Sequence, residues 1–431
     1  MFTSLRHSAA LLCAAVLLQG CATSGSLNDA RSQFYSGQPQ AAIDTLTTET
    51  VSKRNRLLAH LDHGLIAHTA GNYEESIKAF KEASSLLNQI NFIGVREQTA
   101  SLVTNDWVTS YKGEYSERLW IHSFQMMNFL LLGQPEGAAV EARQALKIYE
   151  EHGGALKNDW YSRTLMAMSL EAAGKPDSAH IEYKKLLEEI GSDTGAARRA
   201  WQNARRLGRD QDAEKFKNLI TTTASIGKKK GELVIFVQSG SIPRKIAGNL
   251  YLAPDLFASF PIYPDIPRPN IQVTVIKEGS EQQADTVTTQ MVDISRSALA
   301  ARGKQVAVKQ IARLAAKKEL ARQIRKSADS SAELFLGGFI TAALYVSEVA
   351  DTRSWETLPA QVSMVQIPLD AGTHNVTLLI RHGSNEYEVP VSDIQIEADQ
   401  ITYRSLRTGS GAPKIIPTAE LIVPAKGQPA P

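Results

Sequence analysis

Thiols are the most reactive side chains of this chain, which has two cysteines, Cys13 and Cys21. A thiol can act as a nucleophile, hold a metal ion, form a disulfide or carry an acyl chain. Neither cysteine belongs to a C-x-x-C pair, which argues against a redox or zinc motif. Cys21 stands where the apolar run of residues 9–18 gives way to small and polar residues. This position indicates a targeting segment with a modification site at its end.

The sequence around Cys21 has the form of a processing site. Leu18-Gln19-Gly20-Cys21 follows a basic start and an apolar core shorter than the about 20 residues that cross a bilayer. It resembles the lipobox of bacterial lipoproteins. In that family the thiol is diacylated, the chain is cut before the cysteine, and the new amino terminus is acylated with a chain such as palmitate. Ala22, in place of Asp, implies the outer membrane. An ordinary signal peptide that happens to contain a cysteine is the alternative.

Histidines are the next candidates for chemistry. His60, His63 and His68 lie close together in a segment with helical periodicity, but no acidic or cysteine partner completes a zinc site there. The sequence also lacks a G-x-S-x-G nucleophile elbow, an H-E-x-x-H zinc motif and a G-x-x-x-x-G-K phosphate loop. We therefore expect no metal, no cofactor, no catalytic residue and no enzyme activity.

Basic residues gather in the segment 296–326, which holds ten lysines and arginines and one acid. On a helix, Lys309, Arg313 and Lys317 share one face and are candidates for binding anionic headgroups or lipopolysaccharide phosphates. The apolar residues change face past Ala316, whereas a membrane-surface helix keeps one apolar stripe. A solvated basic helix that changes its packing partner is therefore the preferred interpretation.

Arg353 and Trp355 form a further candidate binding corner, together with Asp351. An arginine over an indole ring makes a cation–π contact that can serve recognition. The preferred alternative is that Trp355 anchors the chain in the core.

Helical periodicity and turn signals recur across residues 28–226. In the clearest unit, residues 57–87, Gly64 allows two helices to approach and Gly71 closes the turn between them. Tyr73 and Phe80 follow on the apolar face of the second helix. The turn glycines, at spacings of 34, 62, 41 and 34 residues, are Gly37, Gly71, Gly133, Gly174 and Gly208. The spacing of 62 requires an insertion or a lost copy.

These units resemble the tetratricopeptide repeat (TPR), a helical pair of about 34 residues. The resemblance implies a solenoid with a groove for a protein partner, and it makes Tyr73 and Phe80 candidate partner-binding residues, together with Arg353 and Trp355. A plain helical bundle is the alternative.

Strand patterns dominate after the charged linker at residues 227–231. Residues 233–237 read as a buried strand, and short alternating runs with turn signals continue from residue 362. The apolar stretch 334–346 is too short to span a membrane and is predicted as a buried helix. The run PLDAGTHNVTLLI is similar to PEGA-type β-sandwich modules. The motif ADTRSWETLP, at residues 350–359, resembles that of a family of proteobacterial TPR lipoproteins.

The sequence thus predicts an N-terminal TPR-like α-solenoid followed by an α+β region that ends in a small β-sandwich. The expected segments are a signal peptide (1–20), a lipidated tether (21–27), the repeat domain (28–226), an α+β region (231–349), a sandwich-like module (350–408) and a flexible tail (409–431).

The leading hypothesis is a scaffold, lipid-anchored in the outer membrane and facing the periplasm, that binds an envelope protein in its repeat groove. It would act in envelope assembly, secretion or cell-wall synthesis. The alternatives are a polysaccharide- or lipid-binding module and an enzyme accessory acting through the C-terminal domain. A formal net charge of +2 argues against nucleic acid as a partner. The sequence does not define an oligomeric state.

We expect Cys21→Ser to abolish membrane association that resists a carbonate wash, because no other segment of the sequence is long and apolar enough to span a bilayer. Fractionation of cells that express either protein measures this. A variant that stays in the washed membrane pellet would contradict the lipobox interpretation.

Overall fold

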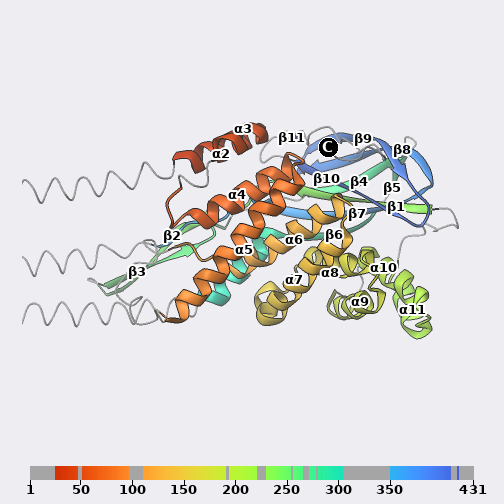
Figure 1. The fold of residues 1–431 in the computed structure, drawn as a ribbon, viewed down its shortest axis with the longest axis horizontal. Helices are drawn as coiled ribbons and strands as arrows, with labels where there is room; N and C mark the ends of the chain where they lie inside the picture. Colours follow the sequence, from red (N-terminus) through yellow and green to blue (C-terminus); the bar gives the residue numbers. More distant parts are fainter. Residues whose placement is uncertain are drawn as a thin grey trace, which may run out of the picture.

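The protein is an array of paired helices that packs against a β-sandwich (Figure 1). The computed structural model describes residues 25–46, 51–96, 110–190, 194–220, 230–253, 256–265, 271–277, 280–282, 284–303, 350–408 and 415–416. Cys21, the basic residues Lys309, Arg313 and Lys317, the stretch 334–346 and nearly all of 409–431 lie outside these residues. What the sequence predicts for them stays a prediction.

Within the described residues, five successive pairs of helices form the array, and the two helices of each pair contact each other. The pairs are α2 (Gly25–Tyr35) with α3 (Pro39–Thr45), α4 (Arg56–Thr69) with α5 (Tyr73–Arg96), α6 (Tyr115–Leu131) with α7 (Pro135–Leu156), α8 (Trp160–Ala172) with α9 (Pro176–Ile190), and α10 (Thr194–Arg206) with α11 (Asp210–Lys217). A further helical segment covers residues 291–303.

The same glycine turn joins the helices of every pair. All five predicted turn glycines have positive φ, between 66° and 83°, a region that L side chains rarely adopt. At Gly71 the next amide, that of Asn72, bonds back to the carbonyl of Ala67 at 2.9 Å, and the equivalent bond recurs in the other four turns. The helical-repeat prediction is therefore confirmed in its coarse form. Because α5 contacts α6, the spacing of 62 residues is an insertion between neighbouring pairs.

Two sheets form the sandwich. The five-stranded sheet has the order β11-β10-β1-β7-β6, and the four-stranded sheet has the order β5-β4-β8-β9. The strands of the first are β1 (Lys230–Ser239), β6 (Asp285–Gln290), β7 (Gln361–Asp370), β10 (Ile401–Thr408) and β11 (Ile415–Ile416), and those of the second are β4 (Ile271–Lys277), β5 (Ser280–Gln282), β8 (Gly372–His382) and β9 (Asn385–Ile396). β2 (Ile246–Ala253) and β3 (Leu256–Ile262) form a separate two-stranded ribbon.

The strand pairing corrects the predicted division of the C-terminal half. β1 pairs with β7 and β10, and β4 pairs with β8. Strands from 231–349 and from 350–408 therefore alternate in the five-stranded sheet, and the β4–β8 pairing joins the two regions in the four-stranded sheet. The region 350–408 is not a separate module. The sequence could not show this, because strand partners far apart in the chain leave no local pattern.

The central strand β1 is buried on both faces, which explains its continuous apolar run. Val234 and Phe236 point into the core shared with the helices. Leu233, Ile235 and Val237 point into a second core between the two sheets. This alternation follows from the two-residue period of a strand. The molecule thus has three layers: helices, five-stranded sheet and four-stranded sheet.

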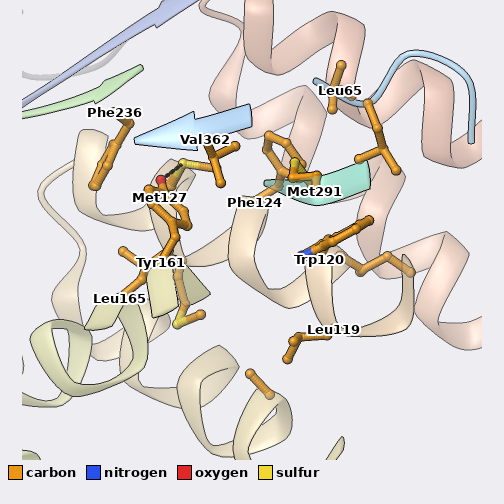
Figure 2. Packing of buried hydrophobic residues seen from close by; sticks show 14 of the residues in the cluster. Leu65, Leu119, Trp120, Phe124, Met127, Tyr161, Leu165, Phe236, Met291 and Val362 are labelled. Carbon is orange, nitrogen blue, oxygen red and sulfur yellow. Dashed lines mark hydrogen bonds between the residues drawn. The ribbon is translucent and has the colours of Figure 1, made fainter. Parts of the chain in front are cut away.

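The first helices of the second to fifth pairs contact the five-stranded sheet. Contacts join α4 and α6 to β10, α8 to β6 and β7, and α10 to β6. Figure 2 shows side chains of α6 and α8, including Phe124 and Tyr161, lying against Phe236 of β1 and Val362 of β7. The sandwich therefore fills the inner side of the array, where the sequence predicts an open groove for a partner. That prediction of a partner-filled groove is wrong for this part of the array.

The contact between Gly64 and Phe80 offers a test of helix packing. A Cβ atom at Gly64 would lie 2.6 Å from the Phe80 ring, whereas nothing lies within 4 Å of one at Gly154. We expect Gly64→Leu to lower the free energy of unfolding by about 1–3 kcal/mol, because the Phe80 ring must shift and α4 and α5 must move apart. Gly154→Ala, on an exposed part of α7, should leave the free energy of unfolding unchanged or raise it.

Chemical denaturation of both variants decides between these outcomes. Equal stability of Gly64→Leu and the unmodified protein would show that α4 and α5 do not pack as described.

Candidate functional site

The residues that the sequence nominates for partner binding meet at the boundary between array and sandwich. Phe80 and Trp355 are both 0% exposed, with ring centroids 5.6 Å apart, and Phe124 lies 5.7 Å from Trp355. A partner cannot reach buried rings, so the nomination of Phe80 and Trp355 as partner-binding residues is corrected. Trp355 is an anchor in the core, as the preferred alternative stated.

Two hydrogen bonds fix Trp355 in this position. Its backbone amide donates to Glu117 Oε1 of α6 at 3.0 Å, and its indole Nε1 donates to Thr357 Oγ1 at 3.0 Å. Thr357 in turn donates to Asp62 of α4 at 2.8 Å. The loop after residue 350 is therefore tied to two different helical pairs.

Arg353 also serves the contact between array and loop. It pairs with Asp351 and donates to the Arg54 carbonyl at 2.9 Å. Its guanidinium lies 5.7 Å from the ring centroid of Tyr111, so the predicted cation–π contact forms with Tyr111 and not with Trp355.

Tyr73 differs from Phe80 and Trp355 because it is only half-buried. Its ring lies 5.6 Å from that of His68. Burial raises the pKa of Tyr73 to about 12, although Arg404 of β10 opposes this shift. Tyr73 is thus a neutral side chain at the margin between α5 and β10.

A buried charged cluster that the sequence analysis missed lies at the start of α6. Lys245, just before β2, donates to Glu114 Oε1 at 2.7 Å, and Arg302 donates to Glu114 Oε2 at 3.2 Å. Burial alone would raise the pKa of Glu114, but the two cations outweigh it and lower that pKa to about 2. Glu114 and Glu117 have the spacing of a capping box, which marks the start of a helix. The two cations that bond to Glu114 come from residues far along the chain, so no local pattern predicts them.

Glu117 is the second buried carboxylate of this cluster. It accepts hydrogen bonds from the Tyr111 hydroxyl at 2.5 Å and from the Glu114 amide at 2.9 Å. Burial raises the pKa of Glu117 above its ordinary value. A carboxyl group of this kind can do acid–base chemistry, but here its oxygens hold the backbone of residues 114 and 355.

Every helical pair contributes a polar contact to the strands or to the loop after residue 350. In the first pair Arg31 contacts Glu356 at 2.9 Å, and in the fourth the Tyr161 amide donates to Thr289 of β6 at 2.9 Å. In the fifth, Arg198 pairs with Asp285 and Arg199 with Glu232. Buried ion pairs of this kind give the contact a defined register, because removing one partner leaves an uncompensated charge.

His68 makes the contact of the second pair. Its Nδ1 lies 2.5 Å from Asn128 Oδ1, and its Nε2 lies 2.6 Å from Gln238 Nε2 of β1 and 3.1 Å from Ser405 Oγ of β10. Nδ1 therefore carries the proton and Nε2 accepts, which defines a neutral ring. Burial, together with the nearby Arg407, lowers the pKa of His68 to about 4, although the bond to Asn128 opposes this shift.

The three histidines of α4 do not converge. His63 pairs with Glu75 of α5 at 2.9 Å, whereas His68 bonds to amides and a hydroxyl. Among the described residues, no group of three or more His, Cys, Asp or Glu side chains is placed to hold a metal ion. The same residues contain no helix long and apolar enough to cross a membrane.

Comparison with solved structures finds helical-repeat proteins. YrrB, described as a TPR protein with an unusual peptide-binding site, is 15% identical over 48% of this chain and 89% of its own, with a TM-score of 0.33. MamA is 12% identical over 46% of this chain and 88% of its own, with a TM-score of 0.33. MamA from Desulfovibrio magneticus RS-1 is 11% identical over 46% and 90%, with a TM-score of 0.32.

No family model and no curated protein matches the chain. Its own geometry, five glycine-turned pairs packed in sequence, makes the helical part TPR-like. Likeness at these TM-scores supplies neither a partner nor an activity.

The neutral state of His68 predicts a pH dependence of stability. The unfolded chain binds a proton near pH 6.5, whereas the folded ring does so only near pH 4. Protons therefore favour the unfolded state in this window, and stability falls as pH falls from 6.5 to 4 by at most about 3 kcal/mol. Denaturant unfolding at several pH values measures the slope.

His68→Gln should be less stable at pH 7 but should show a shallower loss between pH 6.5 and 4. His382→Gln, at a half-exposed position of β8, serves as the control and should keep the original slope. An unchanged slope in His68→Gln would assign the pH dependence to other groups.

Proposed function

We propose that this protein is an interaction scaffold that the Cys21 lipid anchors to the outer membrane, facing the periplasm, and that binds an envelope protein through the outer side of its helical array. The process served would be envelope assembly, secretion or cell-wall synthesis. The inner side of the array is not available, because the sandwich covers it.

The observation that carries this proposal is a pair of exposed apolar residues in neighbouring repeats. Val140 of α7 and Ile181 of α9 are 45% and 51% exposed. Each stands seven positions after its turn glycine, so the two occupy equivalent places in the third and fourth pairs. The equivalent residues of the other pairs, also exposed, are charged: Asp44, Lys78 and Lys215. An apolar interruption of a charged row is typical of a contact site.

The positions of the titratable and charged side chains support a scaffold rather than an enzyme. His68, Glu114, Glu117 and Arg353 all face partners inside the protein, and each joins the array to the sandwich, to the base of the ribbon or to the loop after residue 350. Such groups position the two parts of the molecule. A rigid body with a fixed outer surface is what a scaffold requires.

We expect Val140→Asp combined with Ile181→Asp to weaken capture of the envelope partner about tenfold or more, because truncating a central apolar contact commonly costs 1–2 kcal/mol. The measurement is photo-crosslinking in cells from a benzoylphenylalanine at position 144, an exposed site one turn after Val140 on α7 that the substitutions leave in place, followed by recovery with and without them. Lys78→Asp combined with Lys215→Asp, at equivalent positions, is the matched control and should retain capture.

Folding of the variants is checked by thermal unfolding, which should not change because both side chains are exposed. Crosslinks of equal yield from positions 78, 140, 181 and 215 would contradict a contact site at the apolar pair.

A further inference from the structure

The β2–β3 ribbon belongs to neither sheet of the sandwich. It projects beyond the helices at one end of the long axis (Figure 1). Within the described residues it packs extensively against no other labelled helix or strand. A two-stranded ribbon is marginally stable in water, so its surface needs an apolar environment.

One face of the ribbon is apolar and uncovered. Ile246 is 46% and Phe260 37% exposed, and the register places Ile246 opposite Ile262 and Phe260 opposite Gly248. Directly paired residues share a face, so all four lie on the same side. A Cβ at Gly248 would lie 3.1 Å from Ile262 and 3.2 Å from Phe260, so these two side chains lie flat over the glycine.

The β2–β3 ribbon carries little charge away from its base. Between Lys245 and Asp265, the sequence contains one charged residue, Asp255. Lys245 is buried against Glu114, and Arg296 of the helical segment 291–303 donates to the Pro264 carbonyl at 2.5 Å. The described residues of both strands are therefore uncharged, and the bonds of Lys245 and Arg296 hold the base of the ribbon.

The basic segment starts at this same base. Arg296 and Arg302 contact the residues that hold the ribbon, and residues 296–326 carry ten lysines and arginines against one acid. An apolar surface that is joined at its base to the start of this basic segment matches a bilayer with anionic headgroups. The first helix, α2, begins only four residues after Cys21 and starts toward the same end of the molecule (Figure 1).

We propose that the apolar face of the β2–β3 ribbon docks into the headgroup interface of an anionic bilayer, with Phe260 and Ile246 as its inserted side chains. The open edges of the ribbon keep it at the interface, because unpaired backbone groups are not tolerated in the hydrocarbon core. This inference deepens the proposed function, since it rests on a membrane location and gives the scaffold a second contact besides the lipid.

The test uses the unlipidated full chain, Cys13→Ser and Cys21→Ser, so that its outcome does not depend on the anchor. Phe260→Cys in this background carries an environment-sensitive nitrobenzoxadiazole label, and Ile181→Cys carries the same label as a matched control. Both are mixed with vesicles of phosphatidylethanolamine and phosphatidylglycerol, or of phosphatidylcholine alone.

We expect the label at position 260 to shift to the blue with the anionic vesicles only, and the shift to weaken in high salt. The label at position 181 should not respond. In co-sedimentation, Ile246→Ser combined with Phe260→Ser should lower vesicle affinity about tenfold or more, whereas Val140→Ser combined with Ile181→Ser should not change it.

Three results would overturn the proposal. No vesicle response at position 260 removes the bilayer as the occupant. A label that is already blue-shifted without vesicles and independent of protein concentration shows that another part of the chain covers the face. A shift that depends on protein concentration assigns the face to a second copy.

Discussion

The apolar side formed by the first helices of the array has to be buried, and the five-stranded sheet buries it. Phe124 and Tyr161 on the helices meet Phe236 and Val362 on the strands in one continuous core. Trp355 lies at the centre of this contact, 0% exposed and bonded through its amide to Glu117. Because repeats mainly contact their neighbours, an array of this kind would otherwise present a long apolar face to water.

Buried charge gives this contact its specificity. Lys245 with Glu114, Arg198 with Asp285 and Arg199 with Glu232 each cross from the array to the C-terminal half. Burial of unpaired ions is costly, so these pairs form only in one relative position of the two parts. Side chains capable of acid–base chemistry, such as Glu117, bond across this boundary. The large apolar side chains that stay exposed among the described residues are Val140 and Ile181 on the outer helices, and Ile246 and Phe260 on the ribbon.

Several features of the fold could be read from local signals. Glycine tolerates positive φ, so a glycine between two apolar helical segments predicts a turn, and all five turn glycines have positive φ. The run at residues 233–237 indicated a strand buried on both faces, and the structure places its side chains in two cores. The candidate site was harder to predict. Phe80 and Trp355 pack against each other in the core, and both are too buried for a partner to reach.

The sequence by itself determined the helical pairs, their turns and the strand-rich second half, because each rests on a period or a residue type within a few positions. It also determined the lipobox resemblance at Cys21 and the charge of 296–326. Only the tertiary structure decided that the sandwich fills the inner side of the array and that 350–408 shares its sheets with earlier strands. The bond from Glu117 to Trp355 spans 238 positions. Contacts at such separations follow from how surfaces fit once elements have formed, and no local pattern encodes them.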